Sequence, residues 1–130
     1  MNKKEILTLS TALALFLLHL AAMSHHWYLR HWWFDIPMHF LGGVSIALAV
    51  QYIWFFFFEK PASFRKVVVY TFIGTLCWEV FEAHYDIAGA HVGTSKYFFD
   101  SIKDIIVGTI GALFVAGYSS LLVKYNEKKQ

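Results

Sequence analysis

The sequence predicts an all-α, polytopic membrane protein with four transmembrane helices in an antiparallel bundle. Of its 130 residues, 58% are hydrophobic and 19% are aromatic, which is more apolar surface than a soluble domain of this length can place inside one core. The apolar residues gather in four stretches, and a spanning helix needs about 17–25 predominantly apolar residues. We therefore expect residues 1–130 to form a single four-helix transmembrane domain.

The four helices are expected at about 5–23, 36–58, 66–83 and 100–123. The first follows two lysines, as signal peptides often do, but it contains His19 and no small-x-small cleavage site follows it, so we expect it to be retained. The second begins around Pro37, which the first turn of a helix tolerates. The third is the shortest and reaches spanning length only if it continues through Glu82. Tyr97 to Phe99, aromatic residues typical of a membrane interface, precede the fourth.

The basic residues predict the orientation. With four spans, one side of the membrane receives the termini and the central loop, which carry all but three of the 11 Lys and Arg residues. The positive-inside rule then places both termini in the cytoplasm. The net charge of +2 and the lack of a basic patch outside the membrane flanks argue against nucleic acid as a partner. Cys77 is the lone cysteine, so no internal disulfide can form.

Acidic residues gather where the second, third and fourth helices would meet the outer side of the membrane. They are Asp35, Glu79, Glu82, Asp86, Asp100 and Asp104, and all seven histidines fall on the same side. An ionised carboxylate at bilayer depth costs at least about 2.5 kcal/mol, so each one there needs a partner. Converging acids with a histidine therefore predict a metal or proton site in the bundle.

Helical spacing orients these acids toward the other helices. Residues four apart share a helix face, and two such rows run from acids into small residues: Asp35, His39, Gly43, Ala47 and Asp104, Gly108, Ala112, Ala116. A weaker row is Thr71, Thr75, Glu79. Small residues at this spacing let membrane helices approach closely, so the acids should point into the bundle.

Some of these residues have simpler explanations. Asp35 and Asp100 can be helix N-caps, and His39 can be a buried histidine that donates to Asp35. Glu79 and Glu82 resist such an explanation, because they lie near the negative end of their helix, which disfavours a carboxylate by about 0.3–1 kcal/mol, and one turn apart, where their charges repel. A divalent cation, Lys103, Arg30 or a bound proton is needed to offset them.

The preferred interpretation is a divalent-metal site that works on a lipid or lipid-linked envelope substrate by hydrolysis or transfer. The expected metal ligands are Asp35, His39, Glu79, Glu82, Asp100 and Asp104, with His84 and His91 as further ligands from a loop. An oxygen-rich set with one nitrogen suits Mg²⁺, Mn²⁺, Zn²⁺ or Fe²⁺. In this interpretation Glu79 or Glu82 is the general base, His39 the general acid, and membrane lipids are the partners.

Two other classes of function stay open. One is a non-enzymatic envelope protein that binds a lipid head group or an antibiotic, with structural acids. The other is a proton or metal transporter, although the inner half of the bundle carries almost no ionisable residues. Loss of turnover without loss of stability on Glu79→Gln would indicate an enzyme, and ion flux in sealed vesicles would indicate a transporter.

Three short motifs carry a resemblance to a known family. They are Asp35-Ile-Pro-Met-His39-Phe40, Trp78-Glu79-Val-Phe-Glu82, and the segment from Asp100-Ser-Ile-Lys-Asp104 through Gly108 to Gly111-Ala112. In this order they resemble the VanZ-like family and a related set of uncharacterised small bacterial inner-membrane proteins. The resemblance covers the second to fourth helices and implies the fold and the site, with a weaker implied link to teicoplanin resistance. The chain departs from the VanZ-like pattern at Ile36 (often Lys), Glu82 (often Gln) and Gly108 (often Asn).

Overall fold

The computed structural model describes residues 3–85 and 91–127, so Asp86 lies outside the described residues. It contains five helices: α1 (Lys3–Ser24), α2 (Trp27–Arg30), α3 (Asp35–Phe58), α4 (Phe64–Tyr85) and α5 (Ser95–Glu127). The all-α prediction is confirmed. The sequence did not predict α2, a single turn that follows a left-handed residue, His26 (φ 56°).

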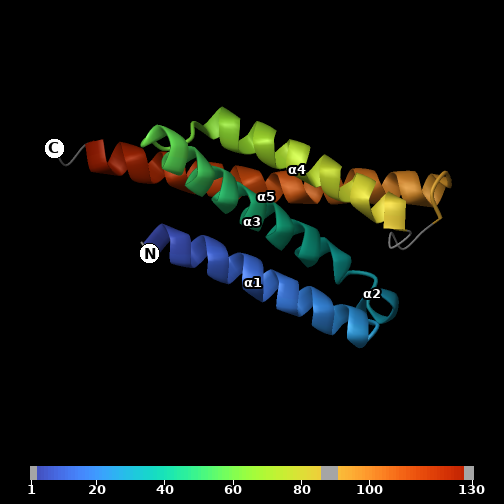
Figure 1. Ribbon diagram of the computed structural model, residues 1–130. Helices are drawn as coiled ribbons and strands as arrows, with labels where there is room; N and C mark the ends of the chain where they lie inside the picture. Colours follow the sequence, from blue (N-terminus) through green and yellow to red (C-terminus); the bar gives the residue numbers. More distant parts are fainter. Residues whose placement is uncertain (1–2, 86–90, 128–130) are drawn as a thin grey trace.

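The four long helices lie side by side and alternate in direction, so that α1 begins and α5 ends at the same end of the bundle (Figure 1). Helices α3, α4 and α5 pack on one another in all three pairs, and α1 packs on α3. Figure 1 shows α1 as the outermost helix, on the far side of α3 from α4 and α5.

Three helices are long and apolar enough to cross a membrane: Glu5–Ser24, Asp35–Phe58 and Ser95–Leu122. Large apolar side chains cover their outer faces, as in Phe57 (70% exposed) and Phe114 (65% exposed), which suits contact with lipid. Helix α4 has 22 residues and comparable length, but Glu79, Glu82 and His84 reduce the apolarity of its last turns. That α4 spans the membrane therefore remains a prediction.

The helix starts correct two predictions about caps. Helix α5 begins at Ser95, earlier than expected, because the Thr94 hydroxyl accepts a hydrogen bond from the Tyr97 N–H at 3.2 Å, a normal N-cap contact. Asp100 is therefore inside the helix and does not cap it. Asp35 is the first residue of α3, and the N-cap position belongs to Phe34, which makes no side-chain cap bond.

Glycines let the backbones of α3 and α5 meet directly. A Cβ added at Gly43 would overlap the carbonyl group of Gly108, and one added at Gly111 would lie 2.5 Å from the Phe40 carbonyl oxygen. Ala47 and Ala112 are fully buried in the same contact. The predicted rows of small residues thus face each other. They bring Asp35, in the first turn of α3, close to the acids of α5.

Candidate metal centre

His39 lies at the centre of a cluster of carboxylates from three helices. Its Nε2 is 3.2 Å from Asp35 Oδ1 and 3.7 Å from Asp104 Oδ2, and its Nδ1 is 3.9 Å from Glu79 Oε1. The His39, Glu79 and Asp104 side chains are between 4% and 11% exposed. The imidazole therefore joins the acids of α3 and α5 on one edge to those of α4 on the other.

Lys103 neutralises one half of this cluster. Its ammonium group lies 2.6 Å from Asp100 Oδ1 and 3.2 Å from both Asp35 Oδ2 and Asp104 Oδ1. The contact with Asp104 is an ion pair without hydrogen-bond alignment, and this buried Oδ1 accepts no hydrogen bond from the described residues. The sequence left open whether Lys103 offsets Glu79 and Glu82; the ion pairs it forms within the described chain are with the three aspartates.

Glu79 and Glu82 form the other half, on α4. The Glu82 carboxylate accepts a hydrogen bond from the Trp78 indole N–H at 2.8 Å, and Ser101 of α5 lies beside Glu79. Two groups of side chains have ligand atoms within 4.8 Å of one another, Asp35–His39–Asp104 and His39–Glu79–Glu82. His39 belongs to both, one ring nitrogen facing each group.

Five carboxylates thus surround a single lysine and a single histidine: Asp35, Glu79, Glu82, Asp100 and Asp104. Even with His39 protonated, negative charge remains in excess within a bundle of apolar helices. Uncompensated buried carboxylates are costly, so the cluster needs bound cations or protons.

The structure brings together five of the six expected metal ligands. The sixth, Asp100, contacts Lys103 and belongs to neither group of close ligand atoms. His84 and His91, the expected loop ligands, are exposed and also lie outside both groups. The residues with ligand atoms close together are thus Asp35, His39, Glu79, Glu82 and Asp104, and the roles of Asp100, His84 and His91 stay predictions.

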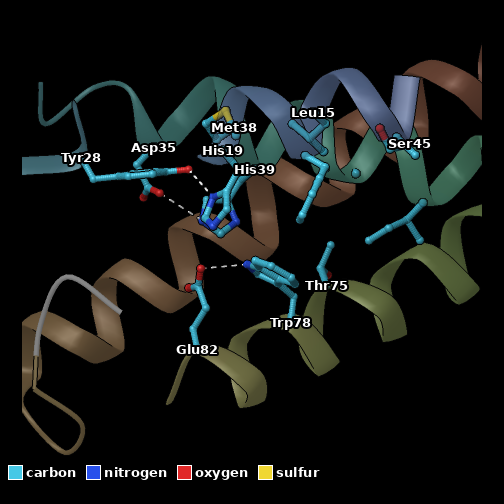
Figure 2. A pocket seen from close by; sticks show the side chains of 15 residues that line it. Leu15, His19, Tyr28, Asp35, Met38, His39, Ser45, Thr75, Trp78 and Glu82 are labelled. Carbon is cyan, nitrogen blue, oxygen red and sulfur yellow. Dashed lines mark hydrogen bonds and ion pairs between the residues drawn. The ribbon is translucent and has the colours of Figure 1, made fainter. Parts of the chain in front are cut away.

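A cavity of about 270 Å³ adjoins the cluster, between α1, α3 and α4. Figure 2 shows Asp35, His39 and Glu82 at one end of it, together with His19, Tyr28 and Trp78.

His19, Tyr28 and Trp78 were not predicted as site residues. Tyr28 and His19 meet only because the chain turns back at His26, which spacing along a helix cannot indicate. The pairing of Lys103 with Asp100 could have been predicted, because the two residues have the three-residue spacing of helical ion pairs.

Tyr28 lies in the short helix α2, between the spans, and its hydroxyl is 2.9 Å from His19 Nδ1. Burial, and then the nearby charges of Asp35 and Glu82, raise the pKa of Tyr28 to about 12. The phenol therefore keeps its proton while its hydroxyl is hydrogen-bonded to His19 Nδ1.

We expect the ultraviolet titration of the folded protein, with that of Tyr28→Phe subtracted, to show one tyrosine that ionises near pH 12. Because the unfolded phenol ionises near pH 10, the folded state holds the extra proton between these values, and Tyr28 should reduce stability as pH rises through this window. A difference spectrum with a midpoint near pH 10 would show that Tyr28 is not in this environment.

Together, these features define a class: a multi-pass, all-α membrane protein with a buried His–carboxylate cluster at one end of its bundle. Residues 2–125 match the family described as "Predicted membrane protein (DUF2238)". The chain belongs to this family. No curated protein and no solved structure matches it. The resemblance to the VanZ-like family is therefore supported only by the three short motifs that suggested it.

Proposed function

We propose that this protein binds one divalent cation through His39, Glu79 and Glu82, and that it uses the cation to hydrolyse or transfer a lipid or lipid-linked envelope substrate. The supporting observation is the orientation of His39. Its Nε2 pairs with Asp35, which leaves Nδ1 as a lone-pair donor directed at Glu79. Histidines that bind metals almost always donate their other N–H to a carboxylate or carbonyl in this way.

The distances suit a single ion. At metal–ligand distances of about 2.0–2.2 Å, two ligand atoms of one ion lie at most about 4.4 Å apart. The 3.9 Å between His39 Nδ1 and Glu79 Oε1 meets this limit, and Glu82, within 4.8 Å of the others, needs only a small side-chain rotation. One imidazole and two carboxylates suit Zn²⁺, Mn²⁺ or Fe²⁺ better than Mg²⁺.

Lys103 favours the His39–Glu79–Glu82 group over the Asp35–His39–Asp104 group as the cation site. Its ammonium contacts both Asp35 and Asp104, so a second cation between these aspartates and His39 would meet a fixed positive charge. We therefore expect one ion rather than two. Three protein ligands leave positions open, as in catalytic zinc sites, where the ion lowers the pKa of a bound water and polarises a substrate oxygen. His39, with both nitrogens engaged, is better placed as a ligand than as the general acid.

The lysine network also supports a second candidate. Lys103 forms ion pairs with Asp100 and Asp104 on its own helix and with Asp35 on α3, and the last of these joins α3 to α5, as expected of structural acids in a non-enzymatic envelope protein. In that case the acids stabilise the bundle, and a head group or antibiotic would be the ligand.

We also propose that the cluster lies on the outer side of a bacterial inner membrane, with both termini cytoplasmic. The support is the basic composition of the segments at the other end of the bundle, combined with the positive-inside rule.

Elemental analysis of detergent-purified protein beside the Glu79→Gln/Glu82→Gln variant tests the proposal. We expect about one Zn²⁺, Mn²⁺ or Fe²⁺ per chain in the parent protein and a loss of at least tenfold in the variant, because an amide is a poor ligand for these ions. Glu59→Gln is the matched control, since Glu59 lies at the opposite end of α3 and should not change the metal content. A parent protein that holds no metal after loading with Mn²⁺ or Zn²⁺ would refute the metal site and leave the structural candidate.

A further inference from the structure

The lining of the cavity beside the candidate metal centre changes from polar to apolar along its length, and it does so on α1, α3 and α4 alike. At the end near the cluster its lining is polar, with His19 from α1, Asp35 and His39 from α3, and Glu82 from α4. Farther along the same helices the lining is mostly apolar, with Leu15, Phe16, Gly42 and Ile46 beside the hydroxyls of Ser45 and Thr75. The Thr75 hydroxyl donates to the Phe72 carbonyl at 2.8 Å, so this side chain has already satisfied its donor on its own helix.

This gradient matches an amphiphile. Asp35 and Ile46 are eleven residues apart on α3, a distance of about 16 Å along the helix axis. The apolar part lies within the spans Glu5–Ser24 and Asp35–Phe58, where the surrounding medium is hydrocarbon and not water. A cavity there is filled by lipid chains more readily than by water, which requires several polar partners.

The volume limits the size of the occupant. An apolar cavity of about 150 Å³ holds one benzene ring, so about 270 Å³ accommodates one alkyl-chain segment but not the two chains of a whole phospholipid. The cavity lies where α1 faces α4, and these helices touch at the edge-to-face pair His19–Trp78, with ring centroids 6.3 Å apart. The polar end of the cavity is therefore bordered by these two aromatic rings.

We propose that the cavity binds the single alkyl chain of an anionic membrane amphiphile, whose phosphate or carboxylate head lies against the metal centre. This inference rests on the proposed function for the head group, because an anion would otherwise meet Asp35 and Glu82 unscreened. It names the substrate class of that site as a one-chain lipid. The apolar lining recognises the chain, and the cation recognises the head.

The test uses a dodecyl phosphate with a diazirine at the end of its chain, photolysed with the detergent-purified, metal-loaded protein. We expect cross-links on Leu15, Phe16 and Ile46, competition by unlabelled dodecyl phosphate, and no competition by inorganic phosphate at the same concentration. Competition by inorganic phosphate would show a plain phosphate site, and labelling confined to lipid-facing residues would show general partitioning into the detergent belt. Either result would overturn the proposal.

Gly42 provides the decisive variant. A Cβ there meets nothing within 4 Å, so Gly42→Leu should extend into the cavity without disturbing the helices and reduce the cavity cross-links at least tenfold. Gly117→Leu is the control, because a Cβ at Gly117 also meets open space and Gly117 does not line the cavity. If Gly42→Leu does not fold, Ala12→Phe fills the same space from α1. Unchanged cross-links in a folded filling variant would contradict the proposal.

Metal content measured on the same samples separates the two proposals. Gly42→Leu should keep the metal while it loses the chain, since Gly42 is not a ligand. A protein that binds metal but gives no cavity cross-links would overturn the amphiphile alone. A protein without metal that still cross-links in the cavity through its chain would overturn the proposed function and the placement of the head group.

Discussion

Gly43→Ala should separate α3 from α5 and destabilise the protein by about 3 kcal/mol. The added methyl group would overlap the backbone carbonyl of Gly108, and a helix backbone cannot move aside as a flexible side chain can. Overpacking of this kind costs about 1–3 kcal/mol, and a backbone contact belongs at the upper end of that range. The thermal unfolding midpoint in detergent, followed by circular dichroism, measures the loss.

Gly42→Ala is the matched control, one residue earlier on the same helix. Its methyl group meets nothing within 4 Å, so it should change stability by less than about 1 kcal/mol, in the stabilising direction expected for alanine in a helix. Because the α3–α5 contact also fixes the position of α3, which carries His39, Gly43→Ala should weaken metal binding. Equal stability of the two variants would show that the backbones do not meet here.

Lys103→Met should have the second large effect, because it should lower the stability of the protein and raise its metal content. Removing the ammonium leaves Asp35, Asp100 and Asp104 without their shared cation. A hydrogen bond to a charged group contributes about 1.5–3 kcal/mol. Since the Lys103 side chain is 35% exposed and water screens part of the interaction, we expect a loss of about 2 kcal/mol without metal.

The same variant should acquire a second ion. With Lys103 removed, the carboxylates of Asp35, Asp100 and Asp104 lose their shared cation, so added Mn²⁺ or Zn²⁺ should take its place, raise the stoichiometry from one to two and restore much of the stability. Lys96→Met, at an exposed position of the same helix, should change neither quantity. A stoichiometry of one in Lys103→Met would refute the idea that the lysine excludes a second metal.

Much of this arrangement followed from spacing alone. The four-residue rows predicted that Asp35 and His39 share a face with Gly43, and that Asp104 shares one with Gly108, because acids and small residues both avoid lipid. Thr71, Thr75 and Glu79 are likewise buried on α4. The sequence could thus place the acids in the bundle interior before any contact was known.

Other parts depended on contacts between distant residues. The start of α5 was assigned too late because Asp100 and Thr94 are both good caps, and only the hydrogen bond from Tyr97 distinguishes them. The ion pair of Lys103 with Asp35 could not be predicted, because it depends on how closely α3 approaches α5. The cavity was not predicted, since it arises from the position of α1, which the three motifs do not include.

The position of α1 has a consequence for how the chain assembles. Helices α3, α4 and α5 pack in every pairing, whereas the main packing of α1 among the long helices is on α3. During synthesis α1 enters the bilayer before α3, α4 and α5, yet the surface that it covers exists only after these helices have arrived. In two-stage assembly, where helices insert before they associate, α1 would wait in the lipid while the other three close around His39. The helix made before the other three would then dock after them, and lipid in the unfilled space beside it would be enclosed as the fold is completed.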